Sequence, residues 1–163
     1  MTIMDFTEIA SQIGDCLMHQ KLILATAESC TGGGAAQAIT SVSGSSHWFE
    51  RGFITYSNQA KMEMLGINDA TLLSFGAVSE PIAQEMALGA IKHSRAQVAV
   101  AITGVAGPTG GTPDKPVGMV CFAWAHKGVK TLSTTQYFEG DRAAIREQAV
   151  QAALQGVLTL CQC

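Results

Sequence analysis

Two short, uninterrupted apolar segments limit the folds open to this chain more than any other feature. Residues 98–102 form the clearer segment, and residues 22–26 have the same character. Strands without polar alternation are typical of sheets that are covered by helices on both faces. The sequence therefore predicts an α/β protein in which these two segments are buried strands.

Helical patterns and one hairpin account for most of the remaining chain. Apolar residues recur at three- and four-residue steps from Phe6 to Leu17 and predict a helix over about residues 5–20. Further helices are expected at residues 33–40, 59–65 and 79–93 and from Asp141 onward, with N-caps at Asn58, Ser79 and Asp141 for the last three. A short strand at residues 52–57 and a hairpin of residues 119–125 and 130–138 complete the pattern. Together they predict a single-domain, three-layer α/β/α sandwich over residues 1–163, with a mixed sheet that includes the C-terminal antiparallel hairpin.

Composition and charge exclude several classes of protein. The chain has 163 residues, 47% of them hydrophobic, which is enough apolar material for one well-filled core. Its formal net charge is -3 and its basic residues are scattered, so no nucleic-acid partner is expected. No apolar run approaches the roughly 18 residues that span a bilayer, and the first residues lack the features of a signal peptide. We therefore expect a cytoplasmic protein without a membrane partner.

The cysteines and histidines form neither metal-binding nor disulfide patterns. Five cysteines, an odd number, occur at positions 16, 30, 121, 161 and 163 without a CxxC pair, which favours reduced thiols over a disulfide framework. The four histidines are far apart and none belongs to an HExxH pair, so no catalytic metal is expected. A Ser-His-Asp triad assembles in space and stays open, with His47 as its least implausible histidine.

The clearest candidate site follows the strand predicted at residues 22–26. The chain changes there from apolar residues to hydroxyls and glycines, in the order Ala27-Glu28-Ser29-Cys30-Thr31-Gly32-Gly33-Gly34. Such a strand-to-helix turn presents side chains at the carboxyl edge of a sheet and free N–H groups at the helix start, and glycines let a ligand approach the backbone. Ser29 and Thr31 are therefore candidate site residues. Cys30 is either an alternative nucleophile, if the helix start lowers its pKa, or a small buried hydrophobe.

A second group of candidates combines hydroxyls with one lysine. Ser45 and Ser46 precede the apolar pair Trp48-Phe49, Tyr56 ends the next predicted strand, and Lys61 lies on the short helix that follows. A lysine whose pKa is lowered by burial replaces histidine as the general base of a serine nucleophile. The alternative is a solvated helix lysine without a catalytic role.

A further hydroxyl ends the strand predicted at residues 98–102. Thr103-Gly104 is followed by residues 107–116, a segment too rich in glycine and proline for regular structure. Long ordered loops in compact domains are usually functional, although such a glycine cluster also serves tight turns. No Gly-Lys-Ser/Thr follows Gly104, Gly107 and Gly110, so the segment is not a Walker A loop.

Short motifs along nearly the whole chain carry a family resemblance. In order, they are Ala27-Glu28-Ser29-Cys30-Thr31-Gly32-Gly33, Gly44-Ser45-Ser46, Thr55-Tyr56-Ser57-Asn58 with Lys61, Gly76-Ala77-Val78-Ser79-Glu80, Thr103-Gly104-Val105-Ala106-Gly107-Pro108 through Gly111-Thr112, Lys115-Pro116-Val117-Gly118 and Gly140-Asp141-Arg142. These motifs resemble the successive signatures of the CinA C-terminal family. The resemblance implies hydrolysis of the carboxamide of nicotinamide mononucleotide to nicotinate mononucleotide and ammonia, in pyridine-nucleotide salvage. It also implies a homodimer that uses no metal or other cofactor.

Longer members of that family carry an N-terminal domain that resembles molybdopterin-binding proteins. Only about twenty residues precede the first predicted strand here, so that domain and any activity located in it are expected to be absent.

Within this resemblance, the candidate residues take chemical roles. Ser29 is expected to be the nucleophile and Lys61 the base, with Ser46 as the competing nucleophile and Tyr56 as a proton relay or orienting group. Backbone N–H groups near Thr31, Gly32 and Gly33 are expected to bind the oxyanion or the phosphate. Ser45 is a further substrate contact, and the 5′-phosphate is assigned to Thr103, Gly104, Gly107 and Arg142. The cationic pyridinium ring could lie against Tyr56 or Phe49.

Two other functions stay open. A catalytically silent nucleotide-binding module would need the glycine loop and Arg142 but neither Lys61 nor the serines. A hydrolase of another phosphorylated amide or ester would use the same residues. Ammonia release from a panel of pyridine nucleotides distinguishes all three.

Overall fold

A five-stranded mixed sheet forms the centre of the molecule, in the order β2-β1-β3-β4-β5. These strands are β1 (Leu24–Glu28), β2 (Phe49–Ile54), β3 (Val98–Gly104), β4 (Met119–His126) and β5 (Lys130–Tyr137). β1 is parallel to both β2 and β3, whereas β4 is antiparallel to β3 and β5. This is a computed structural model, and it describes residues 4–163. The predicted mixed sheet with a C-terminal hairpin is confirmed.

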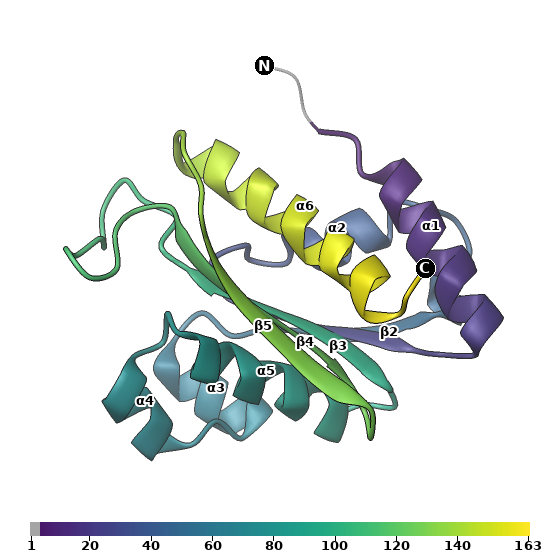
Figure 1. The fold of residues 1–163 in the computed structure, drawn as a ribbon, viewed down its shortest axis with the longest axis horizontal. Coiled ribbons are helices and arrows are strands. Elements are labelled where there is room, and N and C mark those ends of the chain that lie inside the picture. Colours follow the sequence, from purple (N-terminus) through teal and green to yellow (C-terminus); the bar gives the residue numbers. More distant parts are fainter. Residues whose placement is uncertain (1–3) are drawn as a thin grey trace.

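Helices cover both faces of the sheet (Figure 1). One layer contains α1 (Thr7–Gln20), α2 (Gly34–Ile39) and α6 (Arg142–Leu160), and the other contains α3 (Asn58–Leu65), α4 (Asp69–Phe75) and α5 (Glu80–Lys92). Side chains alternate between the two faces of each strand, so each layer packs on its own apolar core. The predicted three-layer α/β/α sandwich is therefore confirmed.

The two cores differ in the size of their side chains. On the side of α1, α2 and α6, β3 contributes Val98, Val100 and Ile102, whereas on the side of α5 it contributes Ala99 and Ala101. Every residue of β1 is buried, and Val98–Ile102 is buried throughout, as predicted for strands covered on both faces. The small alanines leave room for α5 to lie close to the sheet.

The ends of several elements differ from the predictions. Helix α4 was not predicted, and β2 lies about three residues before the predicted segment 52–57. The N-cap of α3 is Ser57, whose hydroxyl accepts the N–H of Ala60 at 3.0 Å, and not Asn58. Ser79 and Asp141 cap α5 and α6 as predicted, with N···O distances of 3.4 and 2.9 Å.

The prediction of reduced cysteines is wrong for one pair. Cys16 in α1 and Cys163 at the C-terminus form a disulfide with a Cα–Cα distance of 5.9 Å. Helices α1 and α6 pack side by side, which brings these two residues together across a sequence separation of 147. Cys30, Cys121 and Cys161 are free and buried.

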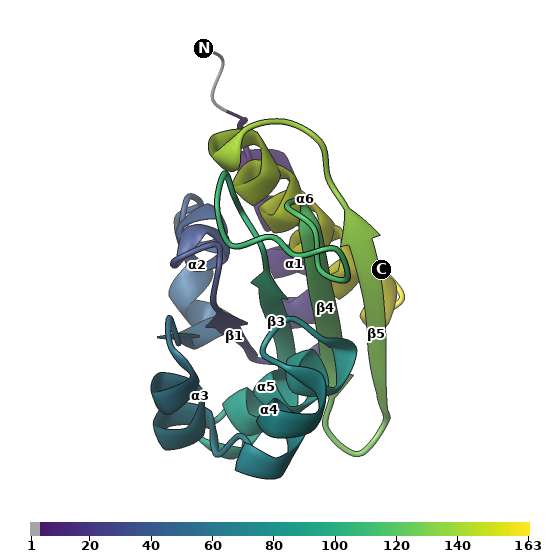
Figure 2. The ribbon, with the colours of Figure 1, turned by 90° about the vertical axis from the view of Figure 1, so that its left-hand side faces the viewer.

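The topology brings several connections to one edge of the sheet. Because β1, β2 and β3 are parallel, their carboxyl ends lie at the same end of the sheet, and the segments that follow them begin there. The loop between β3 and β4 crosses this end of the sheet, and the N-terminus of α6 lies at the same end (Figure 2). The candidate site is built here.

Candidate active site

Ser29 and Lys61 are in direct contact. Ser29 follows β1, and its N–H donates to the carbonyl of Ile102 at 3.0 Å, which continues the pairing of β1 with β3. Lys61 lies one turn into α3, and its ammonium donates to Ser29 Oγ at 3.1 Å and to the carbonyl of Thr55 at 2.9 Å. The structure thus brings together the serine and the lysine that the sequence analysis paired.

The surroundings of Lys61 change its acid–base behaviour. Its side chain is only 2% exposed, and this burial lowers the pKa of the amine below 10.5, with a smaller opposing effect from the neighbouring Cys30. Burial disfavours the charged form of a lysine. The alternative of a solvated helix lysine is therefore wrong. A neutral Lys61 amine in this position can accept the proton of Ser29.

Cys30 is a poor candidate for the nucleophile. Its side chain is buried, and desolvation raises the pKa of the thiol to about 11. The thiolate is the reactive form of cysteine, so this environment keeps Cys30 unreactive near neutral pH.

A cavity of about 300 Å³ opens beside Ser29. It brings the end of β1, the end of β3, the glycine loop and the start of α6 to one space. Its lining residues are Ser29, Cys30, Tyr56, Val78, Gly104, Val105, Ala106, Gly107, Thr109, Gly110 and Arg142. Five of the predicted site residues therefore line one cavity, namely Ser29, Tyr56, Gly104, Gly107 and Arg142.

Arg142 connects three segments of this cavity. It is the first residue of α6, and its guanidinium donates to the carbonyl of Gly107 at 2.7 Å and to the hydroxyl of Tyr56 at 2.9 Å. Tyr56 is 59% exposed, and this hydrogen bond joins its hydroxyl to the start of α6. Phe49 begins β2 at the opposite edge of the sheet, which leaves Tyr56 as the aromatic residue beside the cavity.

The hydroxyls of Thr31 and Thr103 are engaged within the protein. Thr31 donates to Glu28 Oε1 at 2.6 Å, and Thr103 donates to the carbonyl of Ala77 at 2.8 Å. Both side chains are about 1% exposed. These contacts hold the turn after β1 and the segment before α5, and neither hydroxyl is free to donate to a substrate.

Gly32 and Gly33 shape the turn before α2. Both have positive φ values, 59° and 104°, which favour glycine. The N–H of Gly32 donates to the carbonyl of Ser29 at 3.0 Å, so it is not a free donor for an anion. Neither glycine lines the cavity beside Ser29.

Within one copy of the protein, Ser45 and Ser46 lie far from Lys61. They belong to the short 3-10 helix Ser45–His47, which precedes the amino end of β2. The parallel register pairs Leu24 with Phe49 at that end and Glu28 with Ile54 at the other. Ser46 therefore lies near the amino ends of the parallel strands and Ser29 at their carboxyl ends. His47 lies beside Ser46. The structure does not bring the competing nucleophile to the predicted base in the same chain.

Two charged residues beneath the site were missed. Glu28 is 1% exposed and accepts three hydrogen bonds, one from Thr31 and two from the first turn of α2. Arg146, one turn beyond Arg142, donates to the carbonyls of Cys30 and Thr31 at 3.1 and 3.2 Å. A carboxylate at the end of an otherwise apolar strand was the available signal for Glu28, whereas nothing local marks Arg146.

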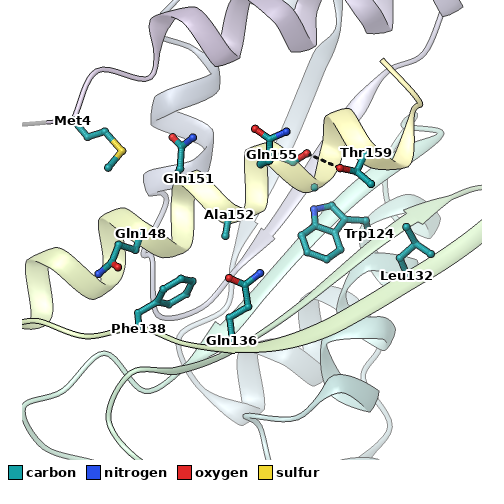
Figure 3. A pocket seen from close by; sticks show the side chains of 11 residues that line it. Met4, Trp124, Leu132, Gln136, Phe138, Gln148, Gln151, Ala152, Gln155 and Thr159 are labelled. Carbon is teal, nitrogen blue, oxygen red and sulfur yellow. Dashed lines mark hydrogen bonds between the residues drawn. The ribbon is translucent and has the colours of Figure 1, made fainter.

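A larger groove lies elsewhere among the described residues. It measures about 520 Å³ and runs between α6 and β5, where Trp124, Phe138 and Gln155 lie among its lining residues (Figure 3). None of the predicted site residues lines it. Among residues 4–163, no group of three or more His, Cys, Asp or Glu side chains could hold a metal ion. Over the same residues, no helix is long and apolar enough to cross a membrane.

Comparison with known proteins settles the family. The profile of the CinA C-terminal domain matches residues 6–161, which is nearly the whole chain. The chain belongs to the CinA C-terminal family. A curated relative of this CinA domain, the nicotinamide-nucleotide amidohydrolase PncC of Escherichia coli K12, is 50% identical over 155 residues, covering 95% of this chain and 94% of the relative. PncC of Pseudomonas putida is 49% identical over 154 residues, covering 94% and 96%.

Solved structures of the same superfamily share the fold of this CinA domain. The crystal structure of the competence/damage inducible protein CihA from Agrobacterium tumefaciens has a TM-score of 0.93 and 43% sequence identity, and the match covers 98% of each chain. The α/β fold described above is therefore that of the CinA superfamily.

Proposed function

We propose that this CinA domain hydrolyses the carboxamide of nicotinamide mononucleotide to nicotinate mononucleotide and ammonia. Relatives about half identical over nearly the full chain are named nicotinamide-nucleotide amidohydrolase. The observation that carries the chemistry is the 3.1 Å contact between Lys61, a buried amine with a lowered pKa, and Ser29 Oγ at the cavity wall.

The proposed reaction has two halves that use the same pair. Ser29 Oγ attacks the carbonyl carbon of the carboxamide while neutral Lys61 takes the hydroxyl proton. The tetrahedral intermediate collapses, the C–N bond breaks, and Lys61 returns the proton to the departing ammonia. Water then attacks the resulting ester, and Lys61 takes its proton and returns it to Ser29 Oγ as the nicotinate product leaves.

Arg142 and the glycine loop are proposed to hold the 5′-phosphate. A guanidinium has five N–H donors, and the two contacts of Arg142 to Gly107 and Tyr56 leave others for an anion. The hydroxyl of Tyr56 accepts from Arg142, which leaves its own proton available for donation. Tyr56 is therefore proposed as an orienting group for the substrate.

We also propose an oligomeric state and a cellular compartment for this protein. The protein is a homodimer in the cytoplasm and acts on free pyridine nucleotides, as the family resemblance implies. Size-exclusion chromatography with light scattering should give twice the chain mass. A monomeric mass at micromolar concentration would contradict the dimer.

Ammonia release from nicotinamide mononucleotide tests the function directly. Product should appear as nicotinate mononucleotide by chromatography, whereas free nicotinamide and a phosphorylated non-pyridine amide should react slowly. Tight binding of the mononucleotide without ammonia release would instead indicate a silent binding module. Faster hydrolysis of another phosphorylated amide or ester would indicate a different substrate.

Substitution of the serines tests the nucleophile. Ser29→Ala should lower kcat by at least about 10³-fold, because a covalent nucleophile is lost. Cys30→Ser should stay substantially active, since its thiol is buried and protonated. Ser46→Ala should cost less than Ser29→Ala. If Ser46→Ala is the inactive variant, the nucleophile is Ser46, and its position in the fold would require a second copy to bring it to Lys61.

A further inference from the structure

Glu28 is a buried carboxylate at the end of β1, directly before Ser29. Its Oε1 accepts the hydroxyl of Thr31 at 2.6 Å and the N–H of Ala35 at 2.8 Å, and its Oε2 accepts the N–H of Ala36 at 3.1 Å. The N-cap of α2 is Gly33, which supplies no side-chain cap. Glu28 therefore supplies from the preceding strand the acceptors that the first turn of α2 lacks.

A charge at this position is costly for stability. The other four residues of β1 are Leu24, Ala25, Thr26 and Ala27, and the whole strand is buried. Removing a carboxylate from water is costly, and hydrogen bonds must offset that cost. A helix of six residues can be capped by a serine or aspartate at its own N-cap, without any buried charge. Capping of α2 alone therefore does not require a buried carboxylate.

Glu28 is connected to Ser29 through the chain and to Lys61 through Thr55. Its side chain accepts hydrogen bonds from Thr31, two residues after Ser29, and from the first turn of α2. Its main-chain carbonyl accepts the N–H of Thr55 at 2.8 Å, and the carbonyl of Thr55 in turn accepts the Lys61 ammonium at 2.9 Å. One residue therefore links the segment of the nucleophile to the segment that orients the base.

We propose that Glu28, acting through Thr31 and the first turn of α2, is a positioning residue that holds Ser29 Oγ in line with Lys61 for attack. This inference rests on the proposed amidohydrolase function. It assigns the Thr31 hydroxyl to the nucleophile turn and not to the substrate. It also means that the N–H groups of Ala35 and Ala36 are occupied by Glu28, so the substrate phosphate is held elsewhere.

Steady-state kinetics of three variants test this role. Glu28→Gln keeps the shape but replaces one acceptor by a donor facing Ala36, and Thr31→Val keeps the shape but removes the hydroxyl. Both should lower kcat by about 10- to 100-fold with KM changed less than about twofold, because a displaced nucleophile loses rate and not binding. Thr31→Ser, which keeps the hydroxyl, should retain most of kcat. Glu8→Gln, an exposed residue of α1, is the matched control and should behave as the unmodified protein.

The pH–rate profile, KM and the amount of folded protein distinguish a positioning role from a substrate-binding or a purely structural one. The variants should keep the midpoint of the pH–rate profile, since Lys61 stays buried. A rise in KM with unchanged kcat in Thr31→Val would place Thr31 on the substrate and overturn the proposal. Unchanged kinetics in both Glu28→Gln and Thr31→Val would overturn it as well. A loss of activity that follows a general loss of folded protein in both would show a purely structural role.

Hydrogen exchange gives a test that does not depend on the reaction. In Glu28→Gln and Thr31→Val, amides of residues 29–36 should exchange at least about tenfold faster while the strands keep their protection. If the unmodified protein releases no ammonia from the mononucleotide, the proposed function fails, and exchange alone decides the positioning role. Unchanged exchange at residues 29–36 would overturn that role even in an active enzyme.

Discussion

At the scale of single residues, burial converts Lys61 from an ordinary helix lysine into a candidate base. The sequence placed it one turn beyond a helix N-cap, where a solvated side chain is the usual outcome. The structure turns that side chain toward Ser29 and leaves it 2% exposed. The chemistry of Lys61 therefore depends on the layer of protein around α3 and not on its neighbours in the sequence.

Lys61→Arg should be nearly as damaging as Lys61→Ala. Arginine keeps its proton at all accessible pH values, so it cannot act as the base. In the unmodified enzyme, kcat/KM should rise with pH through the lowered pKa of Lys61, because only the neutral amine accepts the proton of Ser29. Substantial activity of Lys61→Arg, or a flat profile between about pH 6 and pH 9, would show that Lys61 acts only through its charge.

The same burial couples Lys61 to folding stability. Its pKa is lower in the folded protein than in the unfolded chain, where it is near 10.5, so the unfolded chain binds more protons between the two values. The stability linked to Lys61 is present above the unfolded pKa and is lost as the pH falls through the folded pKa. Relative to the unmodified protein, Lys61→Met should therefore be most stable near neutral pH, and this difference should shrink toward pH 10. Urea unfolding at pH 7 and pH 9.5 measures it; a difference that does not change with pH would contradict the linkage.

At the scale of elements, the start of α6 and the glycine loop form one unit around the cavity. Arg142 joins the loop to Tyr56, while Lys115 at the far end of the loop donates to the carbonyl of Phe75 at the end of α4. A positive charge near the C-terminal carbonyls of a helix is favourable. The loop between β3 and β4 is thus fastened at both ends, as expected for a binding loop and not for a linker.

Arg142→Ala should raise KM for nicotinamide mononucleotide by about 10- to 150-fold, because a charge-assisted contact of about 1.5–3 kcal/mol is lost. Arg142→Lys should recover part of this loss. Nicotinamide riboside lacks the phosphate, so it should be a poor substrate and should lose little further activity in Arg142→Ala. Equal penalties for riboside and mononucleotide would mean that Arg142 serves only to hold Gly107 and Tyr56.

At the scale of the whole molecule, the order of the strands assembles the site. Parallel pairing of β1 with β2 and β3 brings the ends of three strands to one end of the sheet. β5 runs in the same direction as β3, so it also ends there and brings Arg142, at the start of α6, to the site from a distant part of the sequence. The same topology places Ser46 near the amino ends of the parallel strands, at the opposite end of the sheet. The cavity therefore depends on the complete sandwich and not on one motif.

Activity should survive exhaustive chelation. The residues that line the cavity offer a serine, a tyrosine, a buried thiol and an arginine, and no group of three metal-ligating side chains exists in the described part of the chain. Ammonia release measured after treatment with a strong chelator should match that of the untreated protein. A large loss that added metal restores would contradict the Ser29–Lys61 mechanism.

Local patterns were enough to predict much of the fold. Uninterrupted apolar segments predicted β1 and β3, and the alternation of these strands with helical patterns predicted the layers. The capping preference of serine and aspartate predicted the N-caps Ser79 and Asp141. Each of these depends on residues that are neighbours in the chain. The same kind of reasoning selected Ser29, Lys61 and Tyr56, and the family resemblance added Arg142. The structure brings all four to one site, and their roles stay predictions.

Long-range packing decided the rest. The disulfide between Cys16 and Cys163 and the separation of Ser46 from Lys61 depend on which distant segments lie side by side. The sequence suggested that the hydroxyls of Thr31 and Thr103 could bind substrate. In the folded protein they donate instead to Glu28 and to the carbonyl of Ala77. Whether a polar group is free or satisfied, and whether a lysine is solvated or buried, depends on the tertiary structure, because both are set by the three-dimensional neighbours of a side chain.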